Sequence, residues 1–487
     1  MNAAAAGSTT IISIIVTSLL LGSWGAEKYG LWMLVLTMSF DRGYMALLDF
    51  GHGAAALQQL VGDDMDHRRA IKRTLVRKYL GFSTVGLVFL ILVGPWFLNF
   101  VTDESRMESP WKLVMIIAIR LPIDMLHMSN MVELESRSRY GIMRSIDFVS
   151  NASWLIFAIL AASNSASVTS AVSVYLLIGV VQLVLSTLST RGDIGFDWRV
   201  SPGADSESVD LWSRGKWIAL QRISGIIYAN MDRLIISFAV GLVGVGEYEI
   251  PYKIQALGVL LLSILPSAVF PVAAKLQSND AKRQLGDLFT RGTRLAAAVC
   301  VPPLMALIIL SEPLTVIWVG DEYRHLSDSV KLFTSWTFLA VFHVVGATML
   351  NAIGKNKEVF LLGAASIIIN LPLSITFGLQ WGINGVVTGT LAGYAVVFFP
   401  YLYVELKTFD VMLSYWIKRV VFPVAIPGAI QAVLSICAVN LLGANPGVVE
   451  VGVTGLGSTL IGWALFFGFF APAEDRRAIL SAIGSRT

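Results

Sequence analysis

Charged side chains occur deep inside long apolar stretches of this sequence, and their types and spacing point to chemistry. The clearest stretch is 217–241, which carries Arg222 near its start and Asp232 and Arg233 near its middle. A helix of that length, at about 1.5 Å per residue, crosses a hydrocarbon core of about 30 Å. An Arg or Asp at bilayer depth costs roughly 2.5–3.5 kcal/mol, so these residues are expected to face protein or a hydrated cavity. Adjacent helical residues point about 100° apart, so Asp232 and Arg233 each need a partner elsewhere.

A second polar group lies in the apolar stretch 112–132. Arg120, Asp124 and His127 are spaced i, i+4, i+7 and therefore share one helical face. One interpretation is a local Arg–Asp ion pair that compensates the two charges within a helix of the protein interior. The other is a cationic cavity that binds phosphate oxygens, because the planar guanidinium fork binds phosphate through two hydrogen bonds. The candidate substrate-binding cations are Arg42, Arg120, Arg222, Arg233 and Lys253, and the candidate coupling or gating acids are Asp49, Asp124 and Asp232.

Some of these candidates also have a plainer structural interpretation. Lys253 lies about one turn into its apolar stretch, so its ammonium group can extend to the membrane surface. Asp49 can cap a helix break at Gly51 and Gly53. His343 is interpreted as a structural histidine rather than a proton relay.

The composition is that of a multi-pass, all-α membrane protein. Of the 487 residues, 55% are hydrophobic and only 14% are charged, whereas soluble proteins carry about 25% charged residues. Both cysteines, Cys300 and Cys437, lie in apolar runs and indicate neither a disulfide framework nor a metal site. The N-terminus lacks the basic region of a signal peptide, so the first apolar run is expected to be retained. Motifs for a nucleotide, a metal or a nucleophile are missing from the sequence, so we expect no cofactor, no nucleic-acid partner and no enzymatic activity.

Fourteen membrane spans are predicted, with connecting loops of at most about 30 residues. The loops that follow even-numbered spans hold 26 of the 36 Lys and Arg residues. By the positive-inside rule both termini are therefore expected in the cytoplasm, with the chain in the inner or plasma membrane. The predicted spans are 8–24, 30–52, 79–101, 112–132, 145–163, 168–189, 217–241, 247–273, 293–311, 329–352, 358–378, 382–404, 419–441 and 451–470.

The chain contains an internal repeat. Pro, Asp, Glu and Arg recur at an offset of 218 between the segments that begin at Pro95 and Pro313, and Lys112-Leu113 recurs as Lys331-Leu332 at an offset of 219. Spans 1–6 and 7–12 are therefore expected to be two copies in one orientation, an arrangement found in transporters with a central site between two bundles. The alternative interpretation is that Pro, Asp and Glu simply mark helix ends in both segments. The predicted domains are a six-helix bundle over 1–205, a second over 206–405, and two extra helices with a tail over 406–487.

Short motifs in a fixed order resemble those of the polysaccharide exporter family, the Wzx-type flippases of the multidrug/oligosaccharidyl-lipid/polysaccharide exporter superfamily. The motifs are Tyr29-Gly30-Leu31-Trp32, Leu48-Asp49-Phe50-Gly51, Met231-Asp232-Arg233-Leu234, Gly244-Val245-Gly246-Glu247-Tyr248 and Leu350-Asn351-Ala352-Ile353-Gly354-Lys355. The resemblance implies two six-helix bundles around a V-shaped cavity. It also implies a polyprenyl-pyrophosphate-linked oligosaccharide as substrate, flipped from the cytoplasmic to the outer leaflet. The two C-terminal spans are more typical of the lipid II flippase branch.

We expect alternating access through a cationic cavity, driven by H⁺ or Na⁺ or by the membrane potential, which contributes about 2.3 kcal/mol per charge per 100 mV. The bilayer is a partner, and glycan polymerase and chain-length machinery are consistent with this class. A cation-coupled multidrug antiporter of the same superfamily is the alternative, although its cavity would be dominated by carboxylates. A membrane glycan polymerase or ligase is less consistent with the sequence, because those enzymes usually need a sizeable external loop.

Overall fold

The computed structural model describes residues 2–40, 43–60, 65–101, 109–164, 166–191, 211–278, 281–441, 446–472 and 475, and these residues form helices joined by short turns. The chain packs into two units: unit 1 contains Met1–Glu249 with Ser374–Val386, and unit 2 contains Ile250–Leu373 with Val387–Thr487. The predicted all-α, multi-pass fold is confirmed. The predicted domain limits at 205 and 405 describe the sequence repeat, and they stay a prediction.

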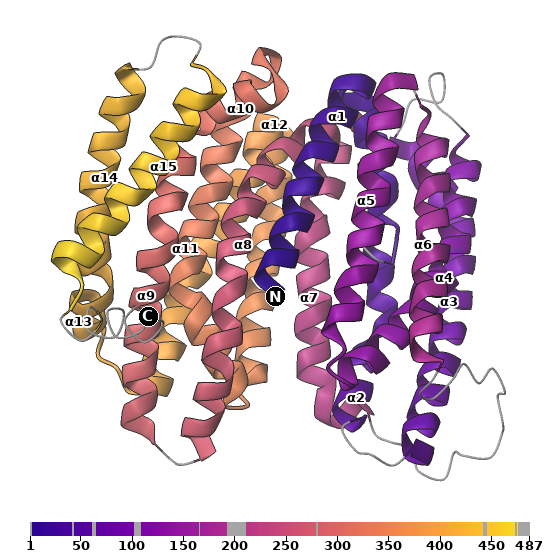
Figure 1. The fold of residues 1–487 in the computed structure, drawn as a ribbon, viewed down its shortest axis with the longest axis horizontal. Coiled ribbons are helices and arrows are strands. Elements are labelled where there is room, and N and C mark those ends of the chain that lie inside the picture. Colours follow the sequence, from indigo (N-terminus) through magenta and orange to yellow (C-terminus); the bar gives the residue numbers. More distant parts are fainter. Residues whose placement is uncertain are drawn as a thin grey trace. The chain divides into compact units, whose positions relative to one another are not determined.

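The helices are labelled in Figure 1. Unit 1 is built from α1 (Asn2–Thr37), the 3₁₀ helix η1 (Tyr44–Asp49), α2 (His52–Gln59), α3 (Met65–Val101), α4 (Pro110–Ser136), α5 (Tyr140–Asn164), α6 (Val168–Thr190), α7 (Leu211–Ala239) and the start of α8 (Leu242–Ser278). Unit 2 continues with α9 (Lys282–Ile309), α10 (Ser311–Val319), η3 (Asp321–Leu326), α11 (Ser327–Ala352), α12 (Asn356–Phe409), α13 (Leu413–Trp416), η4 (Ile417–Val421), α14 (Phe422–Leu441), α15 (Val448–Leu465) and η5 (Phe466–Phe470).

Eleven helices in the described part of the chain are long and apolar enough to cross a membrane. The helix α12 extends over two predicted spans, and α1 extends over the first predicted span and the first part of the second. Each of these helices contains a glycine with positive φ, Gly382 in α12 and Gly25 in α1. The helix α7 coincides with the seventh predicted span but is not among the eleven. The fourteen predicted spans are therefore roughly consistent with the helices observed.

The second predicted span, 30–52, is wrong in its second half. The helix α1 ends at Thr37, and the chain continues through η1 and α2. The hydroxyl groups of Thr37 and Ser39 donate to main-chain carbonyls three residues earlier, as do the amides of Met38 and Ser39. Such local hydrogen bonds compete with the α-helical pattern. The break places Asp49 at the end of η1, directly before α2.

Two glycines of the sequence motifs meet where α1 crosses the start of α8 in unit 1. A Cβ atom on Gly30 would lie 1.9 Å from the carbonyl oxygen of Leu242 and 2.9 Å from the amide nitrogen of Gly246. A Cβ atom on Gly246 would lie 2.0 Å from the carbonyl oxygen of Ala26. Small residues allow membrane helices to pack backbone against backbone, so the motif glycines set this crossing.

We predict that Gly30→Ala destabilises the protein by about 1–3 kcal/mol, because its methyl group would force the two helices apart. Thermal unfolding of the purified protein in detergent should show a lowered Tm. The matched control is Gly22→Ala in the same helix, where an added Cβ meets no atom within 4 Å. Equal Tm values for the two variants would contradict the close crossing.

Candidate substrate site

The charged residues in the middle of α7 are held by the start of α8, within unit 1. Arg233 Nε donates to Glu249 Oε1 at 2.6 Å, and the Glu249 side chain is 0% exposed. Tyr248 Oη donates to Asp232 Oδ2 at 3.1 Å. The prediction that Asp232 and Arg233 each find a partner elsewhere is confirmed. Neither Glu249 nor Tyr248 was predicted as a partner, since each lies 16 positions from the residue that it contacts.

Arg120 lies in α4, is buried, and is held on several sides. Its Nε atom donates to both carboxylate oxygens of Asp124, at 3.0 and 2.9 Å. In α6, the centroid of the Tyr175 ring lies 3.2 Å from Arg120 Cζ. The main-chain carbonyl of Tyr175 accepts a hydrogen bond from Arg120 Nη1. The side chain of Gln182 accepts a further hydrogen bond at 3.4 Å. The i, i+4 pair predicted from the spacing is therefore formed, and it joins α4 to α6.

Arg222 is the most accessible of the three candidate arginines Arg120, Arg222 and Arg233. Its Nη1 atom lies 3.1 Å from Asp49 Oδ2, and its side chain is 44% exposed whereas that of Asp49 is 2% exposed. The other oxygen of Asp49 accepts hydrogen bonds from Tyr79 Oη at 2.6 Å and from the amide of Gly53 at 3.0 Å. The predicted capping of the helix break by Asp49 is thus confirmed, and Arg222 sits over an acid that other groups hold in place.

Two candidate cations remain, Lys253 and Arg42. Lys253 belongs to unit 2, and its Nζ atom lies 5.7 Å from the centroid of the Tyr252 ring. Arg42 lies outside the described residues. Among the candidates that the structure describes, Arg120, Arg222 and Arg233 therefore each contact a different acid. A shared role in binding substrate stays a prediction.

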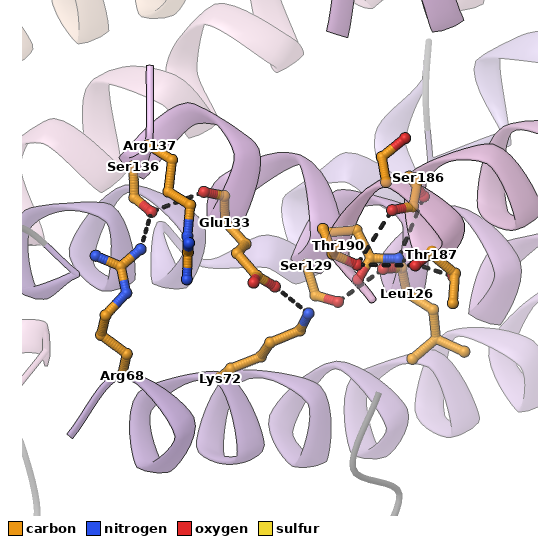
Figure 2. Close-up of polar contacts among 12 residues, drawn as sticks. Arg68, Lys72, Leu126, Ser129, Glu133, Ser136, Arg137, Ser186, Thr187 and Thr190 are labelled. Carbon is orange, nitrogen blue, oxygen red and sulfur yellow. Dashed lines mark hydrogen bonds and ion pairs between the residues drawn. The ribbon is translucent and has the colours of Figure 1, made fainter. Parts of the chain in front are cut away.

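The polar face of α4 extends beyond the three predicted residues (Figure 2). His127 Nδ1 lies 3.0 Å from Ser186 Oγ of α6, which also accepts a hydrogen bond from Asn130. Nearer the end of α4, the buried Glu133 forms an ion pair with Lys72 of α3. Lys72 lies between the second and third predicted spans and was therefore expected in a basic loop. The structure instead places it in a helix and buries it, because the carboxylate of Glu133 compensates its charge.

Unit 2 contains an apolar pocket of about 450 Å³ between α9, α11, α12 and α14. Its walls are formed by apolar residues, among them Met305, Phe342, Phe398, Trp416 and Val424. The pocket offers a space for an apolar chain and no charge for a polar ligand.

Comparison with known proteins identifies the family. Residues 46–328, more than half of the chain, match the model of the family described as "Polysaccharide biosynthesis protein". The chain belongs to this family. The resemblance predicted from the sequence motifs is thereby confirmed.

Relatives in this family carry transport names. A Shigella flexneri protein named "Putative O-antigen transporter" is 21% identical over 393 residues, which cover 77% of this chain and 89% of that protein. The Haloferax volcanii protein named "Probable flippase AglR" is 24% identical over 195 residues, which cover 39% of this chain and 40% of that protein. These names agree with the prediction of a transporter rather than an enzyme.

Solved structures share the fold of this family member. The inward closed conformation of the lipid II flippase MurJ matches with a TM-score of 0.72 at 14% identity, over 95% of this chain and 98% of that chain. An inward-facing multidrug resistance transporter of the MATE family matches with a TM-score of 0.69 at 13% identity, over 84% of this chain and 98% of that chain. At these identities the likeness shows the fold alone.

We predict that Glu249→Met destabilises this family member by about 3–5 kcal/mol, because it leaves the buried guanidinium of Arg233 without its acid. The double variant with Arg233→Met should recover most of that loss, since an apolar pair of similar volume often replaces a buried ion pair at little cost. Folded yield and Tm in detergent measure both effects. A double variant less stable than either single variant would contradict the pairing.

Proposed function

We propose that the chain flips a polyprenyl-pyrophosphate-linked oligosaccharide, a repeat unit of a surface polysaccharide, from the cytoplasmic to the outer leaflet. Family membership over more than half of the chain and the transport names of its relatives support this proposal. The likeness to MurJ supports a fold suited to it. In this proposal the protein lies in the inner or plasma membrane with both termini in the cytoplasm, as the positive-inside rule predicts.

The single observation that supports a phosphate-bearing substrate is that the side chain of Arg222 is 44% exposed. A guanidinium group has five N–H donors, and the ion pair with Asp49 engages only Nη1 among the contacts described. Donors on the exposed side are therefore available to a pyrophosphate, which Arg binds in a bidentate way. Because Asp49 is fixed by Tyr79 and Gly53, it holds Arg222 in place while a phosphate binds.

The buried cations contribute in a different way under this proposal. Arg120 and Arg233 would bind phosphate only by exchanging present partners, so a conformational change of the transport cycle would have to release them. Arg42 and Lys253 complete the proposed cationic set. Asp49, Asp124 and Asp232 are the proposed gating or coupling acids among these residues, because each is buried beside groups that a moving helix would separate.

Transport by alternating access fits an anionic substrate. Outward transfer of a negatively charged headgroup gains about 2.3 kcal/mol per charge per 100 mV of inside-negative potential. The sugars and pyrophosphate would pass through a hydrated path, and the prenyl chain would stay in an apolar environment.

A cation-coupled multidrug antiporter remains the second candidate because the MATE transporter shares the fold. Drug antiporters of this kind bind cationic compounds, for which a cavity rich in carboxylates is expected. The half-exposed charge of the pair Arg222–Asp49 is the cation, while the carboxylate is buried beneath it. This order of charges favours an anionic substrate.

We predict that Arg222→Ala lowers the amount of surface glycan about 10- to 100-fold in a host that lacks its own copy of the gene. The expected loss corresponds to one charge-assisted hydrogen bond to phosphate, about 1.5–3 kcal/mol. Arg222→Lys should retain part of the activity, since it keeps the charge but loses the bidentate geometry. Surface glycan and the cytoplasmic pool of lipid-linked oligosaccharide are measured together, because a flipping defect lowers the first and raises the second.

The matched control is Arg144→Ala. Arg144 is also a half-exposed arginine of unit 1 in an ion pair, 40% exposed and 3.1 Å from Asp147. It should leave surface glycan unchanged within about twofold, because a surface pair contributes about 0–1 kcal/mol. Normal surface glycan from a well-expressed Arg222→Ala variant would remove Arg222 from the mechanism.

A further inference from the structure

Unit 2 buries a histidine–carboxylate pair that the proposed flipping site does not use. His343 of α11 places Nδ1 2.8 Å from Oε2 of Glu405 in α12. Their side chains are 3% and 0% exposed. The residues are 62 positions apart in the sequence, so their meeting depends on how α11 packs against α12.

The chemistry of this pair differs from that of the other buried acids with described ion pairs. Those acids pair with Arg or Lys, whose positive charge persists near neutral pH. The acids in such pairs are Asp49, Asp124, Glu133, Glu249 and Asp475. Only a histidine among these partners gains and loses its proton at physiological pH. The pair His343–Glu405 is therefore neutral overall only while it holds one exchangeable proton between the two side chains.

Each member of the pair also has a buried polar atom without a hydrogen-bond partner within the described part of the chain. These atoms are Oε1 of Glu405 and Nε2 of His343. A buried polar atom left without a partner costs about 1–3 kcal/mol. Packing around this atom is tight, because a Cβ atom on Gly346 would lie 2.0 Å from Oε1 of Glu405. The free oxygen is a position at which a proton can bind.

Aromatic side chains surround the pair. The ring of Phe398 lies 4.3 Å and that of Tyr401 4.8 Å from the His343 ring, measured between centroids. Phe398 also forms part of the apolar pocket of unit 2. This environment is poor in water, so loss of the shared proton would leave a buried, uncompensated carboxylate, which is unfavourable. The proton is therefore expected to leave only when the site becomes hydrated.

Among the described residues, the charged and titratable groups considered near the pair lie on α12 and α9. The rings of Tyr394 and Tyr401, on the same helix as Glu405, lie 6.4 and 4.8 Å from the His343 ring, measured between centroids. The helix α9, which packs on α11, carries Arg291 and Arg294, and both form ion pairs with Asp475. Among the described contacts, His343 is the ionisable group that meets the carboxylate of Glu405 directly.

The internal repeat gives the pair a counterpart in unit 1. With the offset of 219 that relates Lys112 to Lys331, His343 corresponds to Asp124 and Glu405 corresponds to Ser186. In unit 1 these two positions belong to the polar contact between α4 and α6, where Asp124 is bound by an arginine. The equivalent contact is thus polar in both copies, but only in unit 2 is it built from a titratable pair.

We propose that His343 and Glu405 form a proton-binding site that takes up and releases one proton in each transport cycle, and so couples flipping to the proton gradient. The proposal rests on the proposed flippase function for its coupling step. The binding of a proton is a property of the site itself and is testable without transport.

The first experiment measures proton binding on the purified full chain in lipid nanodiscs. Infrared difference spectra across about pH 5–9, the range around an ordinary histidine, should show a protonated-carboxyl signal that is lost in Glu405→Gln. The signal should persist in Glu322→Gln, a control at an exposed glutamate of the same unit. His343→Gln should keep the signal but move its midpoint by about one pH unit or more, because the coupled partner is removed. A signal unchanged in Glu405→Gln, or a midpoint unmoved in His343→Gln, overturns the site.

The second experiment measures coupling as surface glycan at external pH of about 6 and about 8, values on either side of an ordinary histidine pKa. The wild type should make at least about threefold more glycan at the lower pH, and Glu405→Gln should lose this dependence while the Glu322→Gln control keeps it. A Glu405→Gln variant that keeps the wild-type dependence overturns the coupling. If the wild type itself restores no glycan, the proposed function fails, while the infrared titration still decides whether the pair binds a proton.

Discussion

The structure depends on one constraint, which is that a charge inside a low-dielectric, water-poor interior has to be compensated. Arg233 with Glu249, Arg120 with Asp124, and Lys72 with Glu133 all satisfy it by direct ion pairs within unit 1. Each pair also connects or braces neighbouring helices. A partner lost from such a pair is strongly destabilising, whereas the intact pair itself contributes little net stability. Buried charges in this protein thus act mainly as constraints on which helices can lie together.

This constraint also separates structural charges from functional candidates. Arg120 is enclosed by Asp124 and Tyr175, so its guanidinium group has little freedom to meet a ligand. Arg222 has an acid beneath it and an exposed side above it. The pair of His343 with Glu405 satisfies the same constraint with a proton in place of a permanent cation. Exposure and proton exchange, rather than the presence of charge alone, therefore distinguish these positions.

The family assignment and the geometry support each other at the motif residues. Gly30 and Gly246 belong to separate sequence motifs, yet they lie at one helix crossing in unit 1. Asp49 of another motif caps the start of α2 and contacts Arg222. Asp232 and Arg233 of a third motif are bound by the consecutive residues Tyr248 and Glu249. Each short motif is weak evidence for the family by itself. Together, the motif residues have a physical role in helix packing and charge compensation.

The sequence by itself determined the membrane class, nearly all of the spans and the local contacts. Apolar runs long enough to cross a bilayer are encoded residue by residue, and the i, i+4 spacing alone brings Arg120 to Asp124. Only the tertiary structure decided that Glu249 binds Arg233 and that Glu405 binds His343. Helical periodicity fixes the face on which a residue lies, but it leaves open the rotation and axial position of each helix against its neighbour. Contacts between helices depend on those two quantities, which are set by packing across the whole unit.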